Sequence, residues 1–162
     1  MRGTLELAAG AVLLWLAGVW GLVQSFRNRL LAMLHIGFVW LGLALLLGGA
    51  SQWLGWATGT PVLPLGALHA LTMGCLASLM LAMVTRVSAG HGGRPLVADG
   101  RVWVLFLLLQ GLTLLRVLAA WPSGLVAWLL ALTAGGWWVL MVLWGGPLAS
   151  WYGRQRPDGR AG

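Results

Sequence analysis

Hydrophobic side chains occupy five long stretches of the chain, and polar side chains are confined mainly to the segments between them. These apolar stretches cover residues 5–23, 30–47, 63–85, 102–121 and 125–146. Each is near the roughly 20 residues that a helix needs to cross a hydrocarbon core of about 30 Å. They are continuous, whereas the strands of a membrane barrel would alternate apolar and polar positions. The pattern therefore predicts an all-α integral membrane protein.

The composition agrees with this prediction and limits the number of domains. Hydrophobic residues make up 60% of the 162 residues, charged residues only 8%, and the mean hydropathy is +0.89. Such values are typical of a membrane protein. Because the five stretches nearly exhaust the chain, we expect residues 1–150 to form a single bundle of about five transmembrane helices. Residues 151–162 would then be a polar cytoplasmic tail.

The charged residues predict the orientation of the helices. All ten basic residues are arginines, and eight of them fall on one side of a five-helix arrangement: Arg27, Arg29, Arg86, Arg94, Arg101, Arg154, Arg156 and Arg160. The segments 48–62 and 122–124 carry no charge. By the positive-inside rule the N-terminus lies outside and the C-terminus in the cytoplasm. The formal charge of +7 therefore indicates topology and attraction to anionic lipid, not nucleic-acid binding.

The acidic residues and the single cysteine narrow the chemistry. Glu6, Asp99 and Asp158 all lie at the predicted helix edges or in loops, so no buried acid-base pair is expected. A lone Cys75 excludes an internal disulfide and a Cys-x-x-Cys-His haem attachment. No catalytic residue is assigned, and any redox chemistry would be carried by a bound metal or a non-covalently held haem.

The three histidines are the candidate ligands. His35 and His69 fall inside predicted helices, where an ionisable side chain is a functional hypothesis by default. Each has an alternative as a neutral imidazole that is hydrogen-bonded to a neighbouring helix. His91 lies in a glycine-rich turn at the inner interface, where a structural role is the usual one. A metal site shared by His35 and His91 stays open, because both belong to the cytoplasmic side.

The third helix has two different faces. Small residues recur at every fourth position and permit close approach of another helix: Gly66, Ala70, Gly74, Ser78 and Ala82. Roughly 140° away is a second face with His69, Met73, Leu76, Met80 and Met83. Imidazole and thioether groups can bind copper(I) or haem iron, so His69 and Met73 are candidate metal ligands. For the methionines packing is the favoured alternative.

Arg116 is the expected companion of His69. Counted from the predicted helix ends, both lie about 7 to 8 Å below the outer surface. Arg116 could bind a haem propionate by two hydrogen bonds, or its side chain could extend outward to the interface. The same count places His35 roughly 15 Å from His69 along the membrane normal. The two nitrogens on opposite sides of one metal are roughly 4 Å apart, so these histidines should not share one ion.

Arg86 and Arg94 belong to the inner interface. Each could attract lipid phosphate, a haem propionate or an acidic patch on a partner. They are carried with His35, His69 and Arg116 as candidate cofactor-binding residues.

A family resemblance rests on the stretch from His69 to Leu96, HALTMGCLASLMLAMVTRVSAGHGGRPL. It opens with His-Ala-Leu-Thr, followed after one residue by Gly74, and closes with Gly-His, one glycine, and Gly-Arg-Pro at Pro95. In the middle, Met83 precedes Val-Thr-Arg. The stretch resembles the signature of the NnrS family, in which valine usually precedes Met-Thr-Arg. LHIGFVWLGLALLL, at residues 34–47, is similar to the preceding helix of that family.

The resemblance implies a membrane protein of nitric oxide metabolism and denitrification that binds haem b, copper or both. It implies the cytoplasmic (inner) membrane of a bacterium, and the lipid bilayer as the setting. Because the chain resembles one portion of the longer family members, we expect a homo-oligomer or a subunit of a larger respiratory complex. The alternative is a cofactor-free accessory or assembly subunit of a nitric oxide reductase or a haem-copper oxidase. A small transporter is disfavoured by the scarcity of intramembrane carboxylates.

Overall fold

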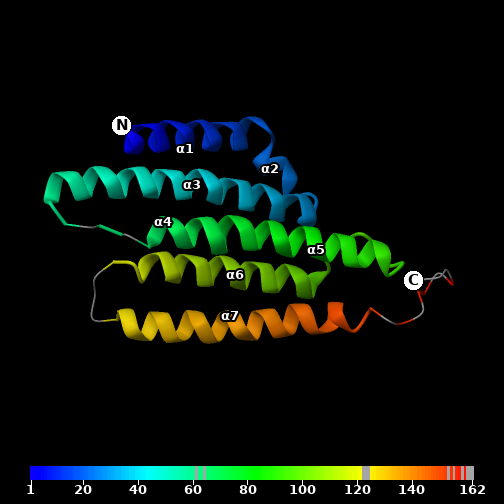
Figure 1. The fold of residues 1–162 in the computed structure, drawn as a ribbon. Coiled ribbons are helices and arrows are strands. Elements are labelled where there is room, and N and C mark those ends of the chain that lie inside the picture. The colour runs from blue at the N-terminus through cyan, green and yellow to red at the C-terminus, as the bar shows by residue number, and fades with distance from the viewer. Residues whose placement is uncertain are drawn as a thin grey trace.

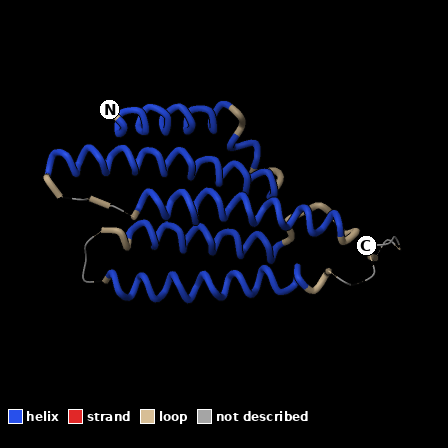
Figure 2. Tube along the Cα trace, in the orientation of Figure 1, coloured by secondary structure: helices blue, strands red, loops and turns tan. Residues whose placement is uncertain are grey.

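The computed structural model describes residues 1–60, 62–63, 65–121, 125–152, 154, 156–157 and 159. Within them five long helical segments run alternately in opposite directions and are joined by short connections (Figures 1 and 2). The elements are α1 (Arg2–Val19), α2 (Leu22–Ser25), α3 (Arg29–Thr58), α4 (Gly66–His69), the π-helical η1 (Ala70–Leu76), α5 (Ala77–His91), α6 (Gly100–Leu118) and α7 (Val126–Ala149). α4, η1 and α5 form one continuous helical rod, Gly66–His91. The described residues contain no strand.

Five of these segments are long and apolar enough to cross a membrane: Arg2–Val19, Arg29–Thr58, Gly66–His91, Gly100–Leu118 and Val126–Ala149. The predicted all-α membrane fold is therefore confirmed, and the chain is a multi-pass membrane protein. Two predicted helix ends were wrong. α3 continues through Thr58, whereas the second helix was predicted to end at residue 47. α5 continues through His91, which therefore ends a helix, whereas the third helix was predicted to end at residue 85.

The reason for the long α3 is its contact with α1. A Cβ atom on Gly49 would lie 2.6 Å from the Gly3 carbonyl oxygen, and one on Gly10 would lie 2.8 Å from the Gly42 carbonyl oxygen. Contacts this short leave room only for glycine, so the two backbones approach closely along their length. Gly49 therefore serves helix packing, although glycine in a sequence more often indicates a turn.

The helices form an open row in the order α1, α3, α4–η1–α5, α6 and α7 (Figure 1). α1 packs on α3 at one edge, and α7 packs on α6 at the other. The largest buried cluster of the described residues lies between α3, α5, α6 and α7 and includes Leu81, Phe106 and Leu140, all fully buried. α7 also reaches α5, because Trp144 Nε1 donates to Thr85 Oγ1 at 3.0 Å.

The π-helical segment changes where the small residues lie around their helix. Positions four apart drift by about 40° per step in an α-helix, which would turn Ala82 about 160° away from Gly66. One added residue in a π turn reverses about 100° of that drift. All five members of the face are buried: Gly66, Ala70, Gly74, Ser78 and Ala82.

Trp40 fills the contact at the middle of this face. A Cβ atom on Gly74 would lie 2.4 Å from Trp40 Cδ2, so the indole ring rests directly on the backbone of η1. Its Nε1 donates to Gln110 Oε1 at 2.7 Å, and Gln110 Nε2 donates to Ser78 Oγ at 3.0 Å. These bonds join α3, α6 and α5 and leave no polar atom of the three side chains unpaired inside the apolar interior.

Candidate functional site

His69 lies at the junction between α4 and η1, where α-helical geometry changes to π-helical geometry. Short π segments that interrupt α-helices are frequent at functional sites. Arg116 of α6 donates from Nε to His69 Nε2 at 3.2 Å, and from Nη1 to Thr133 Oγ1 of α7 at 3.3 Å. One guanidinium therefore links α4, α6 and α7. The Thr133 hydroxyl is itself held in place, because it donates to the Leu129 carbonyl of α7 at 2.7 Å.

The expected proximity of His69 and Arg116 is what the structure shows. The arginine is turned inward to its two partners and does not extend to the outer interface. Thr133 was not foreseen as a member of this group. A threonine in an otherwise apolar helix was the only signal for it in the sequence.

An open pocket of about 310 Å³ borders this group, lined by His69, Met73, Arg116, Thr133, Ala134 and Trp137. This volume is at the lower end of the roughly 300–1,000 Å³ that small-molecule sites occupy. Imidazole, thioether and guanidinium groups meet there on an apolar background. The pocket can accept a ligand that combines apolar surface with a negative charge.

The Nδ1 atom of His69 is buried and has no hydrogen-bond partner of normal geometry among the described residues. A buried polar atom without a partner costs about 1–3 kcal/mol, so such atoms are rare and call for a cause. Nε2, the other ring nitrogen, is held by Arg116. An anionic group that bound Arg116 would free Nε2, and metal-bound histidines use one nitrogen for the metal and the other for a hydrogen bond.

This donor set fits haem better than a bare copper ion. A guanidinium beside the imidazole opposes a nearby bare cation but favours a carboxylate, such as a haem propionate. In addition, the described residues contain no group of three or more His, Cys, Asp or Glu side chains that could enclose a metal ion. Cys75 is buried and is not among the residues that line the pocket.

The methionine face was predicted correctly only at its beginning. Met73 lines the pocket with His69, whereas Leu76, Met80 and Met83 are 54%, 42% and 47% exposed. The π segment, Ala70–Leu76, adds a residue to the helical turn here and so rotates the later positions relative to an uninterrupted α-helix. Met80 and Met83 therefore face outward, as apolar side chains do toward lipid.

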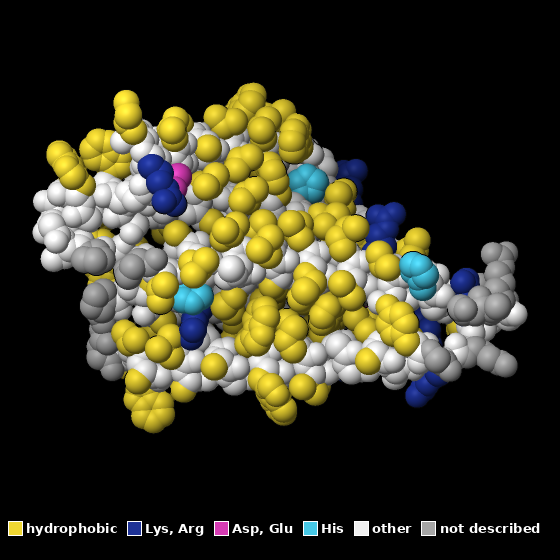
Figure 3. Space-filling model, viewed as in Figure 1, with side chains coloured by type: hydrophobic (Ala, Val, Ile, Leu, Met, Phe, Trp, Pro, Cys, Tyr) yellow, Lys and Arg dark blue, Asp and Glu magenta, His cyan; other side chains and the backbone are white. Residues whose placement is uncertain are grey.

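The other two histidines do not join this site. His35 Nδ1 is paired with the Leu31 carbonyl at 3.2 Å, and His91 Nδ1 with the Val87 carbonyl at 3.0 Å, each one turn back on its own helix. The histidine side chains lie apart from one another in Figure 3. Each of the two keeps Nε2 for another partner, so they remain candidate ligands but not a pair.

The two inner arginines have different surroundings. Arg94 stacks on the Trp151 ring at 4.3 Å and donates to the Gly92 carbonyl at 3.3 Å, which gives it a structural role in the turn after α5. Arg86 is exposed on α5 and lines a hollow together with His91. Neither arginine is near the His69 pocket.

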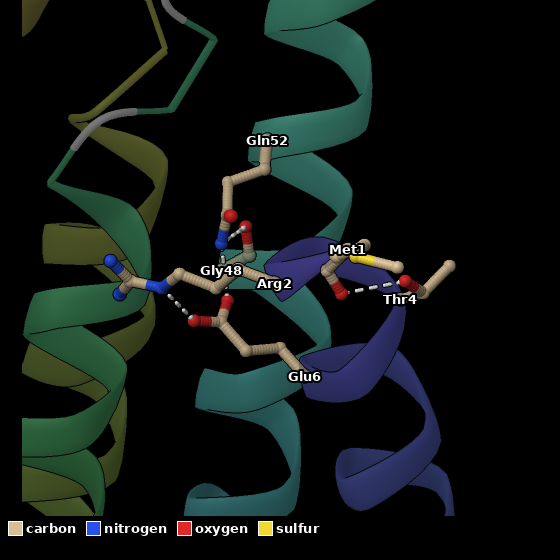
Figure 4. Close-up of polar contacts among 6 residues, drawn as sticks. All are labelled: Met1, Arg2, Thr4, Glu6, Gly48 and Gln52. Atoms are coloured by element: carbon tan, nitrogen blue, oxygen red, sulfur yellow. Dashed lines mark hydrogen bonds and ion pairs between the residues drawn. The ribbon is translucent and has the colours of Figure 1, made fainter.

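Glu6 belongs to a small cluster of hydrogen-bonded polar side chains. From the sequence it was expected only at a helix edge. Arg2 Nε donates to Glu6 Oε1 at 2.7 Å, and Gln52 Nε2 donates to Glu6 Oε2 at 2.6 Å (Figure 4). Gln52 also donates to the Gly48 carbonyl at 3.3 Å. The carboxylate is thus fully engaged in joining α1 to α3 and is a structural feature of that contact.

The sequence profile described as NnrS protein matches residues 1–156 of the chain. The chain belongs to the NnrS family. The match covers all five membrane segments, so the resemblance inferred from residues 69–96 extends to the whole helical row. No curated protein and no solved structure matches the chain. Family membership thus rests on the profile alone, and the His69 pocket is the feature of this NnrS protein with the most unusual chemistry.

Proposed function

We propose that this NnrS protein binds haem, copper or both, with His69 as the principal ligand, and acts in nitric oxide metabolism during denitrification. The observation that carries the proposal is the meeting of His69 and Arg116 beside an open pocket, where His69 Nδ1 has no hydrogen-bond partner of normal geometry among the described residues. Membership of the NnrS family supports the link to haem, copper and nitric oxide. Of the two cofactors, the guanidinium favours haem b.

Each side chain of the pocket has a role in this proposal. His69 would supply the imidazole ligand, and Arg116 would hold a propionate while Thr133 accepts a hydrogen bond from the same guanidinium. Met73 and Trp137, which line the pocket, would give a bound haem apolar contacts. A bound haem would supply an iron that can take up nitric oxide. No catalytic residue is assigned to the protein itself.

His35 and His91 are proposed as candidate copper ligands near the opposite end of the helices, each at its own position and not as a pair. Their Nδ1 atoms are already paired with carbonyl oxygens, which orients Nε2 in the manner of metal-bound histidines. Both positions would be independent of the His69 pocket, because His35 and His69 belong to opposite ends of the membrane. We place the N-terminus outside and the C-terminus in the cytoplasm of a bacterial inner membrane, which puts the His69 pocket near the outer face.

An absorption spectrum and a metal analysis of the full chain, purified in detergent, test the cofactor. We expect a haem band that is lost in His69→Ala and retained in His91→Ala. Helix content by circular dichroism shows that both variants fold. A protein with neither haem nor copper would overturn the proposal. Copper without haem, lost in His35→Ala and not in His69→Ala, would move the principal site to the inner end.

The second candidate is a cofactor-free accessory or assembly subunit of a nitric oxide reductase or haem-copper oxidase. The open row favours it, because α7 is largely uncovered and exposes Trp128, Leu132 and Trp138. Such a face could pack against another copy or a larger subunit. Co-purification of a respiratory subunit with a protein free of haem and copper would favour this candidate over the first.

A further inference from the structure

A basic hollow and an apolar groove meet at the end of α5 that is opposite to His69. The hollow has a volume of about 400 Å³, and its polar lining consists of Arg86, His91 and Arg156. The groove, about 250 Å³, lies between α3 and α5, with Leu30, Leu31 and Leu34 on the α3 side and Ala82 on the α5 side. Three residues line both spaces: Met83, Arg86 and Leu96. The two are therefore parts of one continuous depression.

Among the described residues, the charged side chains that line this depression are all basic. No Asp or Glu is among the described lining residues of either space, whereas Arg86 borders both. Basic side chains also gather at this end of the molecule in Figure 3. A hollow of this kind attracts a negatively charged group that has several oxygen atoms, because each guanidinium can donate two parallel hydrogen bonds to it.

The groove determines what else such a ligand must carry. Leu30, Leu31 and Leu34 occupy the first turns of α3, which begins at Arg29, so the groove starts at the interface and runs into the apolar zone. Apart from Asn28 and Arg86, the described side chains that line it are apolar. A free phosphate would use only the hollow, and an acidic peptide would bring backbone polar groups into a space that cannot satisfy them.

We propose that this depression binds an anionic phospholipid, with its phosphate between Arg86 and Arg156 and one acyl chain in the groove between α3 and α5. The site lies at the interface expected to face the cytoplasm, where anionic lipid is abundant. The head group of the lipid is held by charge, and its acyl chain is held by apolar contact. The site is independent of the His69 pocket, and it assigns Arg86 to lipid and not to a cofactor.

Native mass spectrometry of the full chain in detergent, with phosphatidylglycerol or phosphatidylcholine of equal chain length added, tests this proposal. We expect phosphatidylglycerol to bind at least about fivefold more tightly, and Arg86→Gln to weaken it by about fivefold, as one interfacial arginine contributes. Arg27→Gln is the matched control, because it removes the same charge from the same end of the protein but lies outside the depression. It should leave binding unchanged. If Arg86→Gln does not fold, Arg156→Gln carries the same expectation.

Three results would overturn the proposal. Equal binding of the two lipids would show that charge is not recognised. An equal loss in Arg86→Gln and Arg27→Gln would show that the surface as a whole attracts lipid. Displacement of phosphatidylglycerol by millimolar inorganic phosphate, with a phosphate adduct in its place, would show a simple anion site in which the groove has no part.

Discussion

Arg116 Nε donates a hydrogen bond to His69 Nε2 at 3.2 Å, from one membrane helix to the next. The same guanidinium reaches Thr133 on a third helix. A charged group inside a membrane segment is stable only where its donors are used, and two of the donors are used here. The pair therefore orients the imidazole and at the same time ties α4, α6 and α7 together.

Arg116→Lys tests whether the hydrogen bonds of Arg116, and not only its positive charge, orient His69 and hold the helices together. A lysine keeps the positive charge, but its single ammonium cannot replace a planar fork that reaches His69 and Thr133 together. We expect the free energy of unfolding in mixed micelles to fall by about 1 kcal/mol, as for other hydrogen bonds between membrane helices. Any haem band should shift or weaken as well. Arg27→Lys, at an exposed position, is the control, and equal behaviour of the two variants would contradict the assignment.

Gly74→Ala should disrupt the centre of the helix row. The new Cβ would lie 2.4 Å from Trp40 Cδ2, and Trp40 cannot move without losing its bond to Gln110. Overpacking of this kind destabilises by about 1–3 kcal/mol. Gly111→Ala is a matched control on α6, because nothing lies within 4 Å of its added carbon. Thermal unfolding in detergent measures both, and a Gly74→Ala midpoint equal to that of the control would be inconsistent with the packing described.

Gly10→Ala tests the contact between α1 and α3 in the same way. Its Cβ would lie 2.8 Å from the Gly42 carbonyl oxygen and 2.9 Å from Leu46 Cγ, whereas a Cβ on Gly18 of the same helix meets nothing within 4 Å. We expect Gly10→Ala to lower the unfolding midpoint and Gly18→Ala to leave it unchanged or raise it slightly, since alanine favours helix. If both substitutions raised it, the close approach of α1 and α3 would be refuted.

The sequence was sufficient for the number of membrane helices and for the small-residue face on the third of them. Both depend on local composition and spacing, which the chain displays directly. It also indicated that His69 and Arg116 share a depth, because helix rise converts residue number into distance. The family was recognisable from one helix and the turn after it.

The remaining features depend on contacts between helices, which spacing does not reveal. Gly48 and Gly49 suggested a loop, yet they lie in α3 because α1 packs against them. The π turn after His69 was not predicted, and it separates Met73 from Met80 and Met83. The sequence did contain a signal for the π turn. Small side chains recur every four residues over 16 residues, and in an uninterrupted α-helix such positions drift steadily around the helix axis. Thr133 joined the site only through the packing of α7.

The orientation of the chain can be tested with single added cysteines. Thr58, at the end of α3, and Arg27, before its start, are both exposed and lie at opposite ends of that helix, whereas the native Cys75 is buried and should not react. With the arginine-rich segments in the cytoplasm, Thr58→Cys should be labelled in intact cells by a maleimide that does not cross membranes. Arg27→Cys should be labelled only after the cells are opened. The opposite pattern would invert the protein and place the His69 pocket near the cytoplasm, and labelling of the unmodified chain would show that Cys75 is accessible.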